Sequence, residues 1–478
     1  MTSHSWTQMT RAMLPFADAA SESLPLAQLL RLSLFQVSVG MASVLLLGTL
    51  NRVMIVELSV PAMIVAIMIA LPVLIAPFRA VLGFRSDNYR SAIGWKRVPF
   101  IWFGSLWQMG GLAVMPFALI VLSGDQTLGP AWAGEILAAL AFLMTGLGLH
   151  MTQTAGLALA SDRASDETRH RVVALLYVMY LIGMGISALI IGYLLRDFSN
   201  LTLIRVVQGT ALLGLVLNLI ALWKQEAMRP MSKGERAAPR PAFAQAWADL
   251  MATGSALRLM VIVFVGTLAF NMQDVLLEPY GGEILGLSVG TTTWLSAAWS
   301  FGALIGLAYA ARQLKQHQHP HRLIFQALFV GLLAFPMVIV ATPLSSAGIF
   351  FLGAFSVGLG SGLFAVATLI AAMTLPVTQK AGRGLVLGVW GAAQATAAGC
   401  AIALGGTLRD VFAQLANSGV FGPDWTGPSL GYIAVYQTEI ILLILCLFIH
   451  APLLRLPQST TSNSDTGSEG IRLADFPM

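Results

Sequence analysis

Long apolar stretches occupy most of this chain, and they constrain its fold more than any other feature. Each runs for about 20 residues or more, the length that an α-helix needs to cross the hydrocarbon core of a bilayer. A membrane β-barrel would instead show segments of about 10 residues with alternating polarity, so the continuous stretches predict helices. The twelve predicted spans are residues 32–51, 60–82, 98–121, 132–159, 171–194, 203–223, 258–278, 288–311, 323–342, 346–375, 384–406 and 430–454.

The composition agrees with this pattern. Hydrophobic residues make up 57% of the 478 positions and charged residues 10%, whereas an average soluble domain is roughly 25% charged. Such a chain cannot cover a water-facing surface, which excludes a soluble enzyme and a disordered chain. Cys400 and Cys446 both lie inside apolar stretches, which excludes a disulfide scaffold and a cysteine-based metal site. The predicted class is an all-α polytopic membrane protein.

The basic residues predict the orientation of the chain. If the N-terminus is cytoplasmic, 23 of the 27 Lys and Arg residues lie in cytoplasmic segments, and the exceptions are Arg52, Arg196, Arg205 and Arg409. Because cytoplasmic loops carry an excess of Lys and Arg, both termini are predicted to be cytoplasmic. The net charge of +5 then reflects topology and affinity for anionic lipid headgroups, and no nucleic-acid partner is predicted.

A basic connection that contains several prolines divides the spans into two sets of six. The predicted organisation is a cytoplasmic or interfacial N-terminal segment at 1–31 without a cleavable signal, six-helix halves at 32–223 and 258–455, a cytoplasmic linker at 224–257 between them, and a disordered tail at 456–478. A faint repeat supports the two halves, because Arg52 precedes Glu57 by five positions as Gln273 precedes Glu278. Twelve transmembrane helices in two six-helix pseudo-repeats are typical of the major facilitator architecture.

The connections after spans two and four carry both acidic and basic residues. The string from Gly83 to Arg97 resembles the facilitator-superfamily signature of a glycine, an aspartate and a basic cluster, although Asn88 stands where an arginine usually follows the aspartate. A tight turn with an aspartate that can pair with arginines predicts a latch between cytoplasmic helix ends. The predicted latch residues are Gly83, Asp87, Arg90, Lys96, Arg97, Asp162 and Arg163.

The string from Asp162 to Asp166 is also similar to the aspartate-rich motif with which intramembrane prenyltransferases hold magnesium and diphosphate. Those enzymes need two such clusters that face each other, and the sequence has no second one. We therefore predict no enzyme activity, no catalytic residues and no metal site. His317, His319 and His321 alternate in one connection, and they predict a solvated polar loop rather than a metal centre.

Ionisable residues inside predicted spans are functional candidates by default. Asp274 and Glu278 are four positions apart, which predicts one shared face of span seven. They can bind a proton or a cation, or pair with Arg52 and clamp the halves together, and the clamp is the interpretation we favour. Arg52 and Glu57 lie about 140° apart around an α-helix, which predicts different partners. The full predicted intramembrane network is Arg52, Glu57, Gln273, Asp274, Glu278 and Glu439, and no role follows for Glu439.

Four strings resemble the PucC/LhaA family of phototrophic bacteria, a branch of the major facilitator superfamily. They are Leu50–Leu58, Phe78–Ala80, His150–Asp162 and Gln273–Gly282, within a likeness that covers most of the chain. Members of this family are implicated in assembling light-harvesting antenna complexes and in handling bacteriochlorophyll. The strings resemble the LhaA-like branch, which serves the core antenna around the reaction centre, more than the PucC-like branch of the peripheral antenna.

His150 is the residue that this resemblance makes most interesting. It precedes the cytoplasmic end of span four by about ten residues, hence about 15 Å at 1.5 Å per residue, near the middle of a core about 30 Å thick. Gln153 and Thr154 share its helix face. A neutral imidazole at that depth can ligate the magnesium of bacteriochlorophyll, and the alternative is a hydrogen bond to a neighbouring helix.

The resemblance implies an assembly factor in the bacterial cytoplasmic (inner or intracytoplasmic) membrane that binds or delivers bacteriochlorophyll while antenna polypeptides insert. The implied partners are membrane lipids, the light-harvesting polypeptides, the reaction-centre complex, and bacteriochlorophyll or its biosynthetic enzymes. Two alternatives stay open. One is a secondary transporter that moves a small amphipathic solute by alternating access, and the other is a membrane scaffold that binds no pigment.

Overall fold

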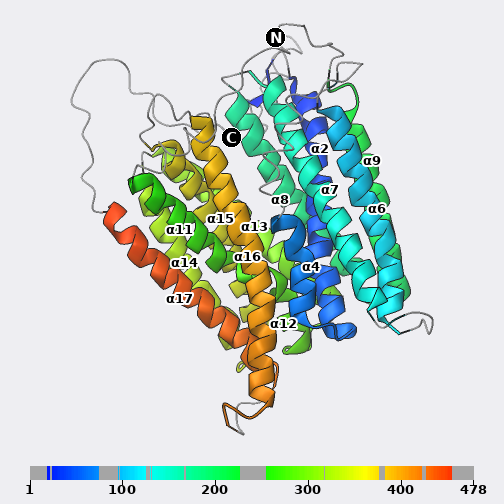
Figure 1. The fold of residues 1–478 in the computed structure, drawn as a ribbon. Helices are drawn as coiled ribbons and strands as arrows, with labels where there is room; N and C mark the ends of the chain where they lie inside the picture. The colour runs from blue at the N-terminus through cyan, green and yellow to red at the C-terminus, as the bar shows by residue number, and fades with distance from the viewer. Residues whose placement is uncertain are drawn as a thin grey trace, which may run out of the picture.

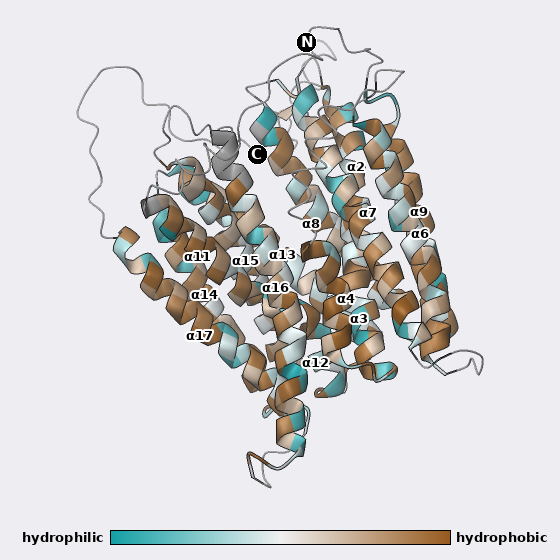
Figure 2. Ribbon diagram, in the orientation of Figure 1, coloured by the Kyte–Doolittle hydropathy of each residue, from teal (hydrophilic) through white to brown (hydrophobic). Residues whose placement is uncertain are grey.

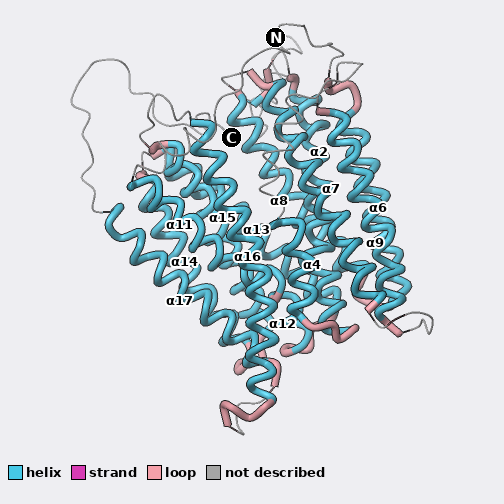
Figure 3. The backbone as a smooth tube through the Cα atoms, in the orientation of Figure 1, coloured by secondary structure: helices cyan, strands magenta, loops and turns pink. Residues whose placement is uncertain are grey.

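The computed structural model describes residues 19–21, 24–74, 95, 97–124, 130, 132–165, 168–226, 254–316, 318–375, 383–422 and 427–454. Within these residues the regular secondary structure is helical. Figure 1 and Figure 3 show a bundle in which the helices of the first half of the chain pack on one side and those of the second half on the other. Residues 1–18 of the predicted N-terminal segment, most of the 224–257 linker, and the tail at 456–478 lie outside the described residues.

The first half begins with one long rod made of four consecutive segments. It consists of α2 (Leu26–Ser43), a π-helix η2 (Val44–Thr49), α3 (Leu50–Arg52) and a second π-helix η3 (Val53–Glu57). The other elements of this half are α4 (Ala62–Leu74), α6 (Val98–Leu122), α7 (Ala133–Arg163), α8 (Arg169–Leu194) and α9 (Asn200–Leu222).

The second half begins with a rod that is broken rather than continuous. Helix α11 (Gly254–Asn271) passes into a 3₁₀-helix η5 (Met272–Val275) and then into α12 (Leu277–Glu283). The remaining elements are α13 (Val289–Lys315), α14 (Pro320–Ala341), α15 (Ala347–Met373), α16 (Arg383–Asn417) and α17 (Ser429–Leu454).

The helices alternate in direction, so the bundle has two distinct ends. We call one the basic end, because Arg31, Arg97 and Arg163 lie there, where α2 and α6 begin and α7 ends. The other is the opposite end, where α9, α13 and α15 begin. The cytoplasmic location of the basic end stays a prediction.

Length and apolar composition identify the membrane-spanning helices. Ten helices of the described residues are long and apolar enough to cross a membrane, which makes this a multi-pass membrane protein. Helix α4 covers the start of the predicted span 60–82, and the rest of that span lies outside the described residues. Helix α16 continues to Asn417, so the helix extends beyond the predicted end of span eleven at residue 406. The count of twelve spans stays a prediction.

Serine side chains cap the starts of three of the helices that begin at the opposite end. The Oγ atoms of Ser199, Ser288 and Ser346 accept hydrogen bonds from the backbone N–H three residues later, at 3.1, 3.3 and 3.4 Å. A serine in this N-cap position satisfies one of the backbone donors that a helix start leaves without a partner. These caps therefore place the helix starts of α9, α13 and α15.

Glycines let helices of the bundle approach closely. A Cβ atom on Gly302 of α13 would lie 2.0 Å from the carbonyl oxygen of Phe355, and one on Gly358 of α15 would lie 2.0 Å from that of Trp299. Such close backbone contact is the usual basis of helix packing in membranes. Between the halves, α8 packs on α13 and α4 packs on α16.

Many large apolar side chains are exposed on the bundle, and Figure 2 shows that hydrophobic residues, in brown, make up much of the helices. Phe103, Phe117 and Phe448 have exposed fractions of 54%, 60% and 73%. A soluble monomer rarely exposes a continuous apolar surface of this kind, whereas lipid chains solvate it. The polar residues that carry chemistry must therefore be sought inside the bundle and at its ends.

Candidate functional site

Polar contacts between the two halves gather at the opposite end of the bundle. The hydroxyls of Thr49 and Thr293 lie 3.1 Å apart, within hydrogen-bond distance. The side-chain amide of Asn51 donates to the carbonyl oxygen of Val275 at 2.7 Å. Both contacts join the first rod of one half to the first elements of the other, so this region forms the joint between the halves.

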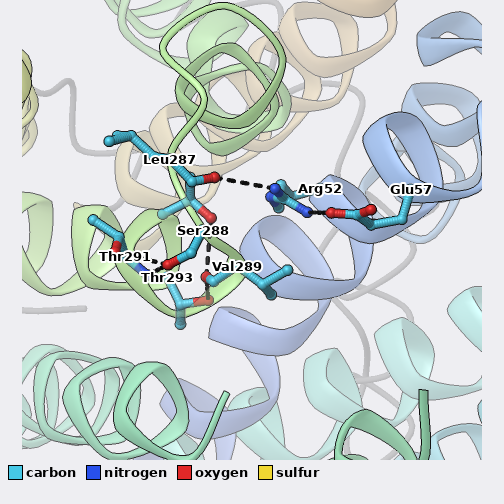
Figure 4. A network of polar contacts seen from close by, with 8 residues as sticks. Arg52, Glu57, Leu287, Ser288, Val289, Thr291 and Thr293 are labelled. Atoms are coloured by element: carbon cyan, nitrogen blue, oxygen red, sulfur yellow. Dashed lines mark hydrogen bonds and ion pairs between the residues drawn. The ribbon is translucent and has the colours of Figure 1, made fainter. Parts of the chain in front are cut away.

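Arg52 lies at the centre of this joint, with 4% of its side chain exposed. Its Nη2 donates to the carbonyl oxygen of Leu287 at 3.2 Å, across to the second half, and its Nη1 forms an ion pair with Glu57 (Figure 4). The prediction that Arg52 and Glu57 have different partners is wrong. The cause is the π-helix η3, whose bond from the N–H of Leu58 to the carbonyl of Val53 spans five residues. Positions five apart share a face in a π-helix.

Asp274 belongs to a compact group of polar side chains around η5. Its two carboxyl oxygens accept hydrogen bonds from the side-chain amides of Asn271, at 2.8 Å, and Gln273, at 2.6 Å. The backbone N–H of Gln273 donates to Glu439 of α17 at 2.7 Å. The structure therefore brings together three members of the predicted network and gives Glu439 a partner that the sequence did not indicate.

Glu278 faces a different set of neighbours. It is 3% exposed, its Oε1 accepts a hydrogen bond from Ser296 of α13 at 2.6 Å, and a Cβ atom on Gly48 of η2 would lie 2.1 Å from that oxygen. The prediction that Asp274 and Glu278 share one α-helical face is wrong, because the chain changes from a 3₁₀-helix to an α-helix between them. The predicted pairing of Arg52 with these carboxylates is also wrong, since Arg52 pairs with Glu57.

A second ion cluster at the opposite end was not predicted. Arg409 of α16 pairs with Asp410 at 2.7 Å and also with Glu283 of α12, and Tyr432 donates to the same carboxylate of Glu283 at 2.7 Å. Asp410 accepts from the backbone N–H of Met63 at 2.7 Å, and so caps the start of α4 in the other half. The sequence interpretation placed Arg409 in a loop, and only the extension of α16 beyond the apolar stretch brings it here.

The basic end carries its own polar network. Arg97 Nε donates to Asp162 at 3.0 Å, which joins two predicted latch residues. The carboxylate of Glu226 accepts from the backbone N–H groups of Arg97 and Val98, each at 3.0 Å, at the start of α6. A carboxylate at a helix N-terminus is favourable, but its position far along the chain hid this contact from sequence reasoning.

Arg163, another predicted latch residue, also reaches the beginning of the central linker. It contacts Gln225 through its Nη1 and donates to Gln28 Oε1 at 2.7 Å through its Nη2. The network thus ties the start of the linker to α2 and α7. Gly83, Asp87, Arg90 and Lys96 lie outside the described residues, and the latch role stays a prediction.

The three pigment-ligand candidates lie together midway along α7. His150, Gln153 and Thr154 are each half-buried and occupy positions i, i+3 and i+4 of one α-helix, so they share a face. Neighbouring positions of α7 pack against α2, α4 and α6. The structure therefore groups these side chains as the sequence predicted, while pigment binding stays a prediction.

Of the histidines predicted in a solvated loop, His319 is exposed just before α14, whereas the prediction is wrong for His321. His321 lies in the first turn of the helix, and its Nδ1 is 3.2 Å from Nε2 of the buried His450 of α17. His319, just outside the span, stacks on His321 with ring centroids 5.2 Å apart. Partial burial, and then the nearby Arg322, lower the pKa of His319 below its ordinary value. His317 lies outside the described residues.

Comparisons with known proteins agree with this architecture. A family model described as "PUCC protein" matches residues 49–457. An uncharacterized protein in the puhA-bchM intergenic region of Rhodobacter capsulatus is 63% identical over 464 residues, which cover 97% of each chain. Protein PucC of Rhodovulum sulfidophilum is 52% identical over 401 residues, 83% of this chain and 88% of that one.

Among solved structures, a bacterial homologue of the human lysosomal transporter Spinster in an inward-facing conformation superposes with a TM-score of 0.66. The identity is 15%, and the match covers 89% of this chain and 95% of that one. At this identity the likeness shows the fold alone, and it confirms the major facilitator architecture. The family match confirms the resemblance at the level of the family. The chain therefore belongs to the PucC family of multi-pass membrane proteins, and its role is related to photosynthesis.

Proposed function

We propose that this protein is an assembly factor for the core antenna and reaction-centre complexes, and that it holds bacteriochlorophyll while the antenna polypeptides insert. Membership of the PucC family supports the photosynthetic role. The observation that carries the pigment-holding step is the position of His150, half-buried and midway along a membrane-spanning helix. In this proposal the protein resides in the bacterial cytoplasmic membrane with both termini in the cytoplasm, and it is not an enzyme.

The residues on this face of α7 suit a chlorin. An imidazole nitrogen is a common metal ligand in proteins, and Gln153 and Thr154 add hydrogen-bonding groups on the same face. Bacteriochlorophyll, when bound, would supply the light-absorbing ring and its magnesium. The chain would supply the ligand nitrogen from His150, and Gln153 and Thr154 could hydrogen-bond to polar groups of the ring.

The test is the absorbance of the purified protein. The protein is expressed in a phototrophic bacterium that makes bacteriochlorophyll, and the chlorin absorbance per protein is compared between wild type and His150→Ala. We expect the substitution to remove most of the band, and His319→Ala, a histidine outside the span, to retain it. An unchanged band in His150→Ala overturns the ligand assignment.

Co-isolation separates the assembly role from a scaffold without pigment. We expect antenna and reaction-centre polypeptides to purify with the wild-type protein together with chlorin in excess of their own content. Recovery of the same polypeptides without excess chlorin identifies a scaffold instead.

A secondary transporter is the second candidate, and two observations favour it. The fold matches that of a lysosomal-transporter homologue, and buried carboxyl groups lie close to the joint between the halves. Gradient-driven uptake of a small amphipathic solute into vesicles, abolished by Asp274→Asn or Glu278→Gln, would support this function. Absence of uptake together with chlorin binding would favour the assembly factor.

A further inference from the structure

One of the three guanidinium nitrogens of Arg52 has no hydrogen-bond partner among the described residues. Its Nη1 pairs with Glu57 and its Nη2 with the carbonyl of Leu287, but its Nε is buried and has no partner in the part of the chain that the structure describes. The guanidinium lies against Gly282 of α12, where a Cβ atom would be 2.9 Å from Nε and from Nη2. The face of α12 that carries Gly282 is thus the surface on which Arg52 rests.

Glu278 has one acceptor that is not used. Its Oε1 accepts from Ser296, while its Oε2 is buried without a partner among the described residues. Glu278 and Gly282 are four positions apart on α12, so they lie on the same face about one turn, or 5.4 Å, apart. The buried Nε of Arg52, which rests against Gly282, and the buried Oε2 of Glu278 therefore lie on the same side of α12.

The charge state of Glu278 follows from its surroundings. The elements packed on α12 are α13, η2, α3, η3 and η5, and the charged groups that they bring to this region are Arg52, Glu57 and Asp274. Helix α13 contributes Ser296 to this region. The charged residues of α13, Arg312 and Lys315, are in its last turn, at the far end of the helix from Ser288. On α12 itself, Glu283 pairs with Arg409, and Tyr280 donates to or accepts from Thr342.

No described cation lies within ion-pair distance of Glu278, because Arg52 is engaged with Glu57. An ionised carboxylate buried in this way is far less favourable than a protonated one. The surroundings therefore favour the uncharged form of the Glu278 carboxyl group, while Arg52 pairs with the partly exposed side chain of Glu57.

We propose that Glu278 is a proton-binding site and that Arg52 moves from Glu57 to Glu278 when the proton leaves. In this step the O–H bond of the Glu278 carboxyl group breaks, the proton passes to water, and the carboxylate keeps the electron pair. Arg52 then provides the counter-charge through its unused Nε, and Glu57, whose side chain is 38% exposed, is solvated by water. Because Arg52 also holds the carbonyl of Leu287 in the other half, the exchange alters the joint between the halves. This inference does not depend on pigment binding.

Infrared difference spectroscopy of the purified protein tests the bound proton. A protonated carboxylic acid has a carbonyl stretch that a carboxylate lacks. We expect Glu278→Gln to lose one component of this band at neutral pH and Glu57→Gln to retain it. A band that Glu278→Gln leaves unchanged overturns the proposal.

A distance measurement tests the exchange of Arg52. Spin labels are placed at Leu201→Cys and Leu344→Cys, two exposed positions next to helix ends at the opposite end, in a background without Cys400 and Cys446. Between about pH 6 and about pH 9, a range that avoids titrating ordinary carboxylates and most lysines, we expect the distance distribution to shift in the wild type. The shift should be lost in Glu278→Gln and retained in Glu439→Gln, the control that replaces another buried carboxyl group with an amide.

Glu57→Gln distinguishes an exchange of Arg52 between two carboxylates from a purely structural role of the Arg52–Glu57 pair. Removal of the competing partner leaves Arg52 free to favour the Glu278 carboxylate, so the midpoint of the distance change should move to lower pH. Arg52→Lys should keep the pH response, because a lysine also supplies a cation. A response that survives in Glu278→Gln, or a midpoint that Glu57→Gln does not move, overturns the exchange.

Discussion

Among the described residues, the buried carboxyl groups lie in the second half of the molecule and not in the first. In the first half, the side chains enclosed deep between the helices include the amides Gln36, Gln108 and Asn218, exposed by 0%, 3% and 1%. In the second half they include the carboxyl groups of Glu278 and Glu439, exposed by 3% and 0%. An amide keeps the same charge at every physiological pH, whereas a carboxyl group can gain or lose a proton. Within the part of the chain that the structure describes, the buried carboxyl groups that can exchange protons thus lie in the second half.

Two arginine–aspartate pairs at the opposite end, one in each half, differ in how deeply they are buried. Arg196 and Asp197 follow α8 in the first half, and their side chains are 66% and 89% exposed. Arg409 and Asp410 lie inside α16 in the second half, and their side chains are 12% and 11% exposed. Each pair follows a leucine directly, so a difference in what the two pairs contribute to stability would come from burial and from the partners that burial brings.

Removal of Arg409 should have the largest effect on stability. Arg409→Ala leaves Glu283 and Asp410 largely buried without their cation, and breaking a buried pair in this way costs about 3–5 kcal/mol. We expect a loss of that size in unfolding by SDS in mixed micelles. Arg409→Lys should lose less, because it keeps the charge but lacks the fork that reaches two carboxylates. A loss below about 1 kcal/mol in Arg409→Ala would mean that the pair is solvated.

A carboxyl group placed in the first half should be tolerated poorly. Gln108→Glu puts an acid where the native amide donates to the Ser38 carbonyl and hydroxyl at 3.2 and 3.1 Å. A charged residue at the centre of a membrane helix costs about 3 kcal/mol, so we expect a loss of that order at pH 8. The loss should shrink toward pH 5, because protonation removes the charge.

The matched variant in the second half is Glu439→Gln. It keeps an oxygen that can accept from the backbone N–H of Gln273 and introduces no charge, so we expect a change of about 1 kcal/mol or less. Equal losses in Gln108→Glu and Glu439→Gln would break the contrast between the halves.

Asn218 should give a smaller effect of opposite sign. Both atoms of its side-chain amide are buried without a partner among the described residues, and such a group carries a desolvation penalty of about 1–3 kcal/mol. Asn218→Leu should therefore stabilise the protein, by about 1 kcal/mol once the larger side chain is accommodated. The measurement is the same SDS titration. Destabilisation would instead indicate that the Asn218 amide binds water or a ligand, and so that a buried amide of the first half has a binding role.

The membrane spans could be predicted from sequence because a bilayer demands long apolar stretches whatever the local geometry is. Helix α6 spans Val98–Leu122 against a prediction of 98–121. The end of α16 was missed because Arg409 and Asp410 look like loop residues until Glu283 and Tyr432, distant in sequence, satisfy them.

The sequence singled out the charged residues of the candidate site but did not indicate which partners they contact. Arg52, Glu57, Asp274 and Glu278 stand out because charged residues are rare in spans. Their partners depend on the π-helix at Val53–Glu57 and the 3₁₀-helix at Met272–Val275. Neither irregularity has a residue pattern that an α-helical periodicity would reveal, and each one rotates the following side chains to a different face.

Removal of Arg196 should have the smallest effect and is the sharpest control for Arg409. Its contact with Asp197 is 3.4 Å long and exposed, and its guanidinium lies 5.5 Å from the ring centroid of Tyr193. Exposed pairs contribute about 0–1 kcal/mol, so Arg196→Ala should shift the SDS midpoint little, and added salt should reduce the difference further. If Arg196→Ala lowered stability as much as Arg409→Ala does, burial would not determine how much such a pair contributes to stability. A small loss for Arg196 beside a large loss for Arg409 would instead assign the difference to the second half's enclosed acidic environment.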